Sequence, residues 1–92
     1  MDLMELRNEI DEIDDAILEL FIKRLNIAEN IAKYKAANSL PVLSAAREQE
    51  ILSRIRELAG DEKAEYAEKI FASILEISKE YQNRRIELND RL

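Results

Sequence analysis

The sequence contains no cysteine and no histidine among its 92 residues. It therefore lacks the usual zinc ligands, a thiol nucleophile, the residues for haem attachment and the commonest general base. A disulfide framework is excluded as well. Any chemistry must use the side chains of Arg, Lys, Glu, Asp, Ser, Gln or Tyr.

Long apolar runs and a positive net charge are also missing. No window approaches the roughly 18 consecutive apolar residues of a membrane-spanning helix, and the first residues have no apolar signal core, so we expect a cytoplasmic protein. The 14 Lys and Arg residues are outnumbered by 20 Asp and Glu residues, which gives a net charge of −6. A field of this sign repels phosphate backbones and anionic lipids, so we expect neither nucleic acid nor a membrane as a partner.

Proline and glycine occur once each, as Pro41 and Gly60, and both lie in short breaks of a helical pattern. The pattern predicts three helices, in the order long, short, long. They run from about Leu3 to about Ala37, from about Ala45 to Ala59, and from about Glu62 to about Asn89. The sequence thus predicts one all-α domain over residues 1–92, because a chain of this length has room for one domain at most.

Residues that favour helix ends flank the second and third predicted helices. Ser44 is well placed to cap the second helix by accepting a hydrogen bond from a backbone N–H group. Gly60 suits the left-handed residue that ends this helix, and Asp61 suits the cap of the third.

An apolar seam of the coiled-coil kind runs along the first predicted helix. Its members recur about every 3.5 residues, and only Arg24 among them is neither apolar nor aromatic. They are Leu6, Ile10, Ile13, Ile17, Leu20, Arg24, Ile27, Ile31 and Tyr34. This helix would be about 50 Å long and the second only about 22 Å, so the chain is too short to cover the seam. We therefore expect two chains to form an intertwined helical homodimer.

The third predicted helix carries two parallel stripes. The first continues the seam pattern and consists of Ala67, Ile70, Ile74, Ile77, Tyr81 and Leu88. The second is partly polar and consists of Phe71, Leu75, Ser78, Gln82 and Arg85. Ser78 and Gln82 lie one turn apart, so they predict either a hydrogen-bonding site or a hydrogen bond between the two side chains.

Arg24 places a permanent charge in the apolar seam, where it must be paired, reach water or face an anion. Lys35 lies three turns further on, so the two side chains leave the same helix face with Cα atoms about 16 Å apart. Two such cations could bracket a small dianion of the carboxylate type. The alternative is an Arg24 side chain that snorkels to water or pairs with a nearby Glu.

Three more charged residues are candidates for the same site. Arg47 and Glu48 open the second helix, where free N–H groups attract anions, although acidic polarity in a first turn is also ordinary. Arg7 is about 25 Å from Arg24 along the helix and on another face, so it can reach that site only from a second subunit. Its alternative is an ordinary surface pair with Asp11.

These residues carry a resemblance to a known family, the all-helical AroQ class of chorismate mutases. It rests on Leu6-Arg7-Asn8-Glu9-Ile10-Asp11-Glu12-Ile13-Asp14, Lys23-Arg24, Ile31-Ala32-Lys33-Tyr34-Lys35, Pro41-Val42, Arg47-Glu48, Ser78 and Gln82. Each motif is weak alone, but together they follow in the family's order and spacing over almost the whole chain. The resemblance implies an intertwined dimer of three-helix chains that converts chorismate to prephenate, with no cofactor and no metal.

The resemblance also implies roles for individual residues. Arg24, Arg47 and Arg7 from the other subunit resemble the family's carboxylate-binding arginines, and Lys35 and Gln82 resemble the pair that binds the ether oxygen of the breaking C–O bond. Glu48 resembles the residue that holds the ring hydroxyl, and Ser78 a lesser contact in the substrate pocket. Ser44, also expected at the substrate, departs from the family, since many members carry Asp there.

Two other functions remain compatible with the sequence. An isochorismate pyruvate-lyase on the same fold would share the cationic pocket but eliminate pyruvate. A non-enzymic helical dimerisation module would use Arg24, Arg47 and Lys35 only as paired surface cations. The order Arg47-Glu48 and the presence of Gln82 favour the mutase over the lyase.

Overall fold

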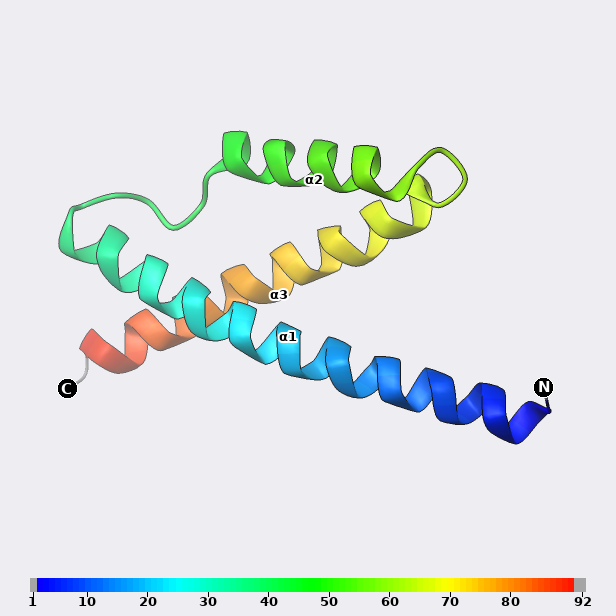
Figure 1. The fold of residues 1–92 in the computed structure, drawn as a ribbon. Helices are drawn as coiled ribbons and strands as arrows, with labels where there is room; N and C mark the ends of the chain where they lie inside the picture. Colours follow the sequence, from blue (N-terminus) through cyan, green and yellow to red (C-terminus); the bar gives the residue numbers. More distant parts are fainter. Residues whose placement is uncertain (1, 91–92) are drawn as a thin grey trace.

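The structure, a computed structural model, describes residues 2–90. These residues form three helices and no strand: α1 (Leu3–Ala37), α2 (Ala45–Ala59) and α3 (Ala64–Asp90), in the arrangement that Figure 1 shows. The predicted all-α class and the bounds of the first two helices are confirmed. None of the helices in this part of the chain combines the length and apolar character needed to cross a membrane.

Side-chain caps fix the starts of α1 and α2. The Asp2 carboxylate accepts a hydrogen bond from the backbone N–H of Glu5 at 2.8 Å, and the Ser44 hydroxyl oxygen accepts one from the N–H of Arg47 at 3.3 Å. Each cap satisfies one of the N–H groups that a helix leaves free at its start. The predicted capping role of Ser44 is therefore confirmed.

The start of α3 differs from the prediction. Gly60 ends α2 with φ of 80° and ψ of 162°, so the positive φ is confirmed, but the backbone is extended in ψ rather than left-handed helical. The carbonyl of Gly60 then accepts hydrogen bonds from the N–H groups of Lys63 and Ala64, at 3.2 and 2.9 Å. These bonds close a turn before the helix, so α3 begins at Ala64 rather than Glu62, and the prediction of Asp61 as its cap is wrong.

Helix α3 supports both other helices. It packs against α1 and against α2, whereas no Cα atom of α1 lies within 8 Å of a Cα atom of α2. Two small buried residues, Ala28 and Ala32, lie one turn apart on α1 and allow it to approach α3 closely. The approach is secured by an ion pair between Arg85 of α3 and Glu29 of α1.

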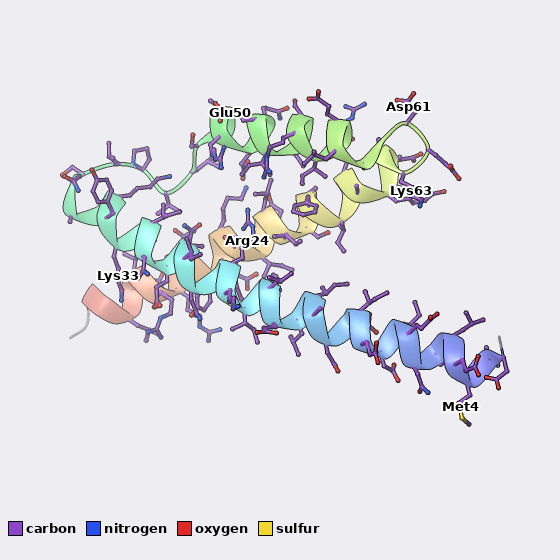
Figure 2. All side chains as sticks on the ribbon, viewed as in Figure 1. Met4, Arg24, Lys33, Glu50, Asp61 and Lys63 are labelled. Carbon is purple, nitrogen blue, oxygen red and sulfur yellow. The ribbon has the colours of Figure 1, made fainter. Side chains whose placement is uncertain are left out.

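The chain is thin and extended for its length. Its principal extents are 54 × 30 × 14 Å and its radius of gyration is 16.5 Å, against about 12 Å for a compact chain of this length. The N-terminal half of α1 projects away from the other helices in Figure 1, and every residue from 2 to 20 is exposed. In Figure 2 the side chains from Met4 onward along this half have no other helix beside them.

The exposed surface area also shows that one chain is not compact. The chain exposes 7535 Å², whereas a compact monomer of this mass exposes about 5500 Å². Among the described side chains, the buried apolar set consists only of Ala28, Ala32, Ile51 and Leu75. One chain alone therefore leaves about 2000 Å² more surface in water than a compact domain would.

The two stripes of α3 have different environments. Leu75, Ser78 and Gln82 of the partly polar stripe are buried against the rest of the chain, while Ile70 and Ile77 of the seam are exposed. On α1 the seam is exposed as well, at Leu6, Ile10, Ile13, Ile17, Leu20, Ile27, Ile31 and Tyr34. The partly polar stripe therefore forms the contact within the chain, while the apolar seam of α1 is exposed and that of α3 is only partly covered.

Candidate functional site

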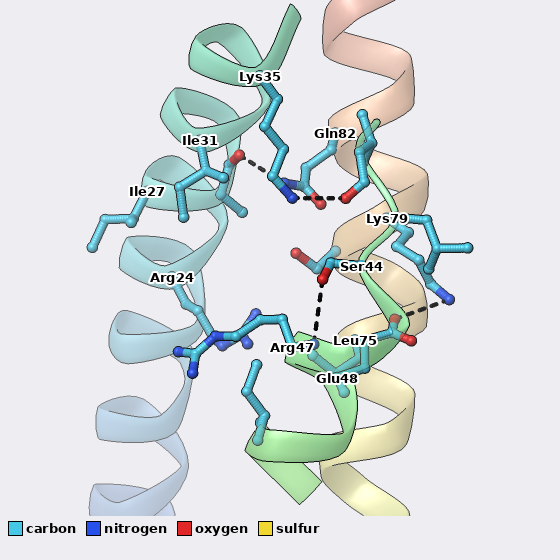
Figure 3. Close-up of a pocket in the computed structure, with 15 residues that line it drawn as sticks. Arg24, Ile27, Ile31, Lys35, Ser44, Arg47, Glu48, Leu75, Lys79 and Gln82 are labelled. Carbon is cyan, nitrogen blue, oxygen red and sulfur yellow. Dashed lines mark hydrogen bonds and ion pairs between the residues drawn. The ribbon is translucent and has the colours of Figure 1, made fainter. Parts of the chain in front are cut away.

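One cavity of about 260 Å³ lies between the three helices, where α1 and α2 both rest on α3. It is slightly smaller than a typical small-molecule pocket, which occupies about 300–1,000 Å³. Seven of the eight predicted site residues line it: Arg24, Lys35, Ser44, Arg47, Glu48, Ser78 and Gln82. Figure 3 shows that they come from all three helices and from the connection that precedes α2.

Two guanidinium groups converge in this cavity. Arg24 from α1 and Arg47 from α2 point toward one another in Figure 3. Burial, and then the positive charge of Arg47, lower the pKa of Arg24 from its ordinary value. Arg47 also pairs with Glu50 at 3.2 Å on the exposed side of α2, while Arg24 has no ion-pair partner among the described residues. An anion placed between the two arginines would relieve this repulsion.

Lys35 enters the cavity from the end of α1, where its ammonium group donates a hydrogen bond to the carbonyl of Val42 at 3.0 Å. The chain reaches this position by a Schellman turn, in which Leu40 N–H bonds to the carbonyl of Lys35 at 2.8 Å and Ser39 N–H to that of Ala36 at 3.3 Å. Ser39 takes the left-handed position of this turn, with φ of 56°. An ammonium group has three donors, so Lys35 keeps two for a ligand.

Ser78 and Gln82 lie on the floor of the cavity and are only 5% and 8% exposed. Gln82 donates its side-chain N–H to the carbonyl of Ala28 on α1, at 2.9 Å, and not to Ser78. The sequence also allowed a hydrogen bond between the Ser78 and Gln82 side chains. The Gln82 amide bonds to Ala28 instead. A side-chain amide has two N–H donors, so Gln82 retains one for the cavity.

Glu48 makes a contact that the sequence analysis missed. Its carboxylate accepts from the ammonium group of Lys79 on α3, at 3.1 Å, and Lys79 also lines the cavity. Lys79 pairs at the same time with Glu76, at 2.6 Å. The available signal was its position, directly after Ser78 and one turn before Gln82.

Arg7 is the predicted site residue that the cavity of this chain does not contain. It lies on the exposed N-terminal half of α1, about 25 Å along the helix from Arg24. The surface pair with Asp11 that the sequence offered as an alternative is absent among the described side chains. Within one chain, Arg7 therefore contributes nothing to the site.

The arrangement suits the recognition of negative charge. Among the described residues, no three acidic side chains gather closely enough to hold a metal ion. Four cationic side chains and one carboxylate converge on the cavity: Arg24, Lys35, Arg47, Lys79 and Glu48. The fold and cavity thus define a class of protein, a small all-helical protein with a cationic pocket for a compact polyanion.

Comparison with known proteins specifies this class further. Residues 6–83 match the family model described as chorismate mutase type II. The chain therefore belongs to the type II chorismate mutase family, which confirms the resemblance seen in the sequence.

Three relatives illustrate the range of proteins that the chain matches. A chorismate mutase of Methanocaldococcus jannaschii is 34% identical over 92% of this chain and 88% of its own length. A bifunctional chorismate mutase/prephenate dehydratase of Aquifex aeolicus is 42% identical over 62% of this chain and 16% of its own length. A 4-amino-4-deoxychorismate mutase of Streptomyces venezuelae is 28% identical over 65% of this chain and 58% of its own length. No solved structure matches the chain significantly.

Proposed function

We propose that the chain is an isomerase that rearranges chorismate to prephenate, in aromatic amino acid biosynthesis, inside the cavity between its three helices. The observation that carries this proposal is the pair of opposed guanidinium groups of Arg24 and Arg47, in a chain of this family. Chorismate is a dicarboxylate, and its rearrangement takes place within one molecule. The reaction therefore needs binding and charge stabilisation more than a nucleophile or a base.

The binding residues act by selecting a reactive shape. Arg24 and Arg47 hold carboxylates of the substrate in the compact, chair-like geometry that the rearrangement requires. This geometry is less favourable than the extended form in solution, so the binding energy of the carboxylates stabilises the reactive conformation. Ser78, on the floor of the cavity, makes a lesser contact with the substrate, and Ser44 contacts it from the start of α2.

The catalytic contribution comes from donors at the breaking C–O bond. Lys35 and Gln82 donate hydrogen bonds to the ether oxygen, where negative charge collects in the transition state. Because their groups are held by Val42 and Ala28, they need little reorganisation when the charge appears. Glu48 accepts a hydrogen bond from the ring hydroxyl and so fixes the ring.

A homodimer completes this proposal, with Arg7 of each chain entering the site of the other. The exposed seam of α1 and the partly covered seam of α3 support it, as does an apolar hollow of about 460 Å³ between these helices, lined by residues such as Ile17, Phe21 and Ile74. The excess of about 2000 Å² of exposed surface per chain agrees with the area that obligate dimers bury. An exposed apolar surface of this extent is typical of an interface.

The alternatives from the sequence have less support. The three relatives described above are all named as mutases, which favours rearrangement over elimination of pyruvate. A purely structural dimerisation module would have no use for an unpaired, half-buried Arg24 opposite Arg47. The cytoplasmic location and the single domain over residues 1–92 remain predictions.

The direct experiment is incubation of the purified chain with chorismate. We expect the diene absorbance to disappear and prephenate to be the product. Isochorismate, tested in parallel, should release no pyruvate. A folded chain that leaves chorismate unchanged would contradict the proposal.

A further inference from the structure

The ammonium group of Lys79 lies between the carboxylates of Glu48 and Glu76. Its ammonium group lies 3.1 Å from Glu48 and 2.6 Å from Glu76. The Glu48 and Lys79 side chains are only 24% and 27% exposed, whereas Glu76 is 73% exposed. The partly buried pair therefore lines the cavity, and Glu76 holds Lys79 from the solvent side.

Lys79 changes what Glu48 can recognise. A carboxylate alone in a cavity attracts a cationic group strongly, but here a fixed ammonium already compensates its charge. The remaining lone pairs of Glu48 can accept a hydrogen bond from a neutral hydroxyl group. A second ammonium group at the same place would lie close to Lys79, in a cavity that also contains Arg24 and Arg47.

Lys79 keeps its positive charge near neutral pH. Hydrogen bonds to Glu76 and then to Glu48 raise the pKa of Lys79 above its ordinary value. The side chain is therefore protonated throughout the physiological range of pH. A fixed positive charge of this kind discriminates by repulsion, which is a common way to exclude a near-identical ligand.

We propose that Lys79 is a specificity-determining residue, which through its pair with Glu48 makes the site prefer a ring that bears a hydroxyl group over a ring that bears an ammonium group. The inference rests on the proposed function, because it assumes that the ring lies against Glu48. It concerns substrate choice rather than rate, since Lys79 acts through Glu48 and not on the breaking bond.

The test compares chorismate with 4-amino-4-deoxychorismate, whose ring carries an amine in place of the hydroxyl group. We expect the parent chain to show the higher kcat/KM for chorismate. Lys79→Met should move the ratio of the two kcat/KM values toward the amine by about tenfold, on the scale of coupling between charged neighbours. Lys79→Arg retains the charge and should keep the parent's preference.

Two controls separate this role from a general loss of charge or fold. Lys69→Met removes another lysine of α3, which pairs with Glu65 on the exposed surface, and should leave the ratio unchanged. In a Glu48→Gln background, Lys79→Met should shift the ratio less than it does in the parent, because the carboxylate that Lys79 compensates is gone and only the direct repulsion by Lys79 is removed. A shift as large in this background as in the parent would overturn the inference, as would an unchanged ratio in an active Lys79→Met variant.

Calorimetric binding of both compounds distinguishes failure of this inference from failure of the proposed function. If the parent binds both rings without rearranging them, the function is wrong, and the ratio of the two Kd values still tests Lys79. If the parent rearranges chorismate and Lys79→Met leaves both ratios unchanged, only the role of Lys79 is wrong. If the parent binds neither compound, both proposals fail together.

Discussion

The side-chain amide of Gln82 donates a hydrogen bond to the backbone carbonyl of Ala28, 2.9 Å away, and so connects α3 to the middle of α1. The two residues are 54 positions apart in the chain and both are buried. This contact fixes the orientation of the amide and leaves its second N–H available to the cavity. Gln82 therefore contributes to the packing of α1 on α3, and in the proposed reaction it also donates to the ether oxygen.

Gln82→Leu should reduce both the activity and the stability, and two measurements report these effects separately. Turnover of chorismate should fall by about a hundredfold, the scale for loss of a donor to developing charge. The free energy of unfolding should fall by about 1–3 kcal/mol, because the carbonyl of Ala28 loses its buried partner. Steady-state kinetics and urea unfolding measure the two effects. Gln49→Leu, at an exposed position of α2, is the control, and equal effects of both substitutions would contradict the assignment.

Lys35→Met should abolish most of the activity without unfolding the chain. The substitution keeps the apolar length of the side chain and removes the cation that stabilises charge on the ether oxygen, so we expect turnover to fall by about a hundredfold or more. Circular dichroism should show unchanged helix content. Lys33→Met, at an exposed position two residues earlier, provides the control for loss of charge. Near-normal turnover of the Lys35 variant would refute its role.

Mixing two inactive variants tests whether Arg7 serves the other subunit. Arg7→Ala and Lys35→Met should each be nearly inactive as purified homodimers. After they exchange subunits, one site of each mixed dimer contains both native residues, so about a quarter of the parent activity should return. Recovery is measured against time after mixing. No recovery, despite mixed dimers detected by mass spectrometry, would show that Arg7 acts within its own chain or not at all.

Ser44→Ala should weaken the start of α2. The hydroxyl of Ser44 accepts from the N–H of Arg47, and loss of such a cap costs about 1 kcal/mol of stability. Ser44→Asp should retain stability, since a carboxylate caps equally well and interacts favourably with the start of a helix. Urea unfolding of the three proteins decides between these outcomes. Equal stability of the alanine variant and the parent would contradict the role of the cap.

Lys79 should give the chain an alkaline limit of stability. Its pKa is raised in the folded state, first by Glu76 and then by Glu48, so folding favours its protonated form. The stabilisation is therefore fully present at neutral pH and is lost as pH rises above about 10. Urea unfolding of the parent and of Lys79→Met should differ at pH 7 and converge as the pH rises past the raised pKa of Lys79. A difference that stays constant across this range would contradict the ion pair.

The main features of the fold follow from few residues. The helix-breaking residues Pro41 and Gly60 divide the chain, and Ser44 marks the start of α2, so the bounds of two helices could be predicted directly. The start of α3 could not, because the extra turn depends on hydrogen bonds to the carbonyl of Gly60. Propensity and capping rules consider side chains and give little information on such backbone contacts.

The packing within the chain was harder to predict than the helices. Periodicity selects the stripe with the largest apolar residues, and on α1 this stripe remains uncovered. The contact with α3 instead uses Ala28 and Ala32, which contribute little to any apolar pattern because they are small. Their importance lies in how closely they allow two backbones to approach, which only the folded arrangement reveals.

The predicted site residues that line the cavity could be selected from the sequence because charge or polarity was unusual at most of their positions. Arg24 lies in an apolar seam, and Ser78 and Gln82 lie on a buried stripe, so each has a helical context that marks it. The position of Lys79 between Ser78 and Gln82 is a much weaker signal, since a lysine beside a buried stripe is ordinary on a surface helix. Its contact with Glu48 joins residues of two helices, and a single sequence gives no register between them.

The backbones of α1 and α2 do not pack against each other, and this affects how the spacing of the site is set. The separation of the Arg24 and Arg47 guanidinium groups depends on two helix interfaces in series, α1 on α3 and α3 on α2. A small shift at either interface therefore changes the distance between the Arg24 and Arg47 guanidinium groups. Ala28 and Ala32 therefore set this spacing. A larger side chain at either position would move α1 away from α3 and separate Arg24 from Arg47, which would weaken the proposed binding of a dicarboxylate without altering either guanidinium group.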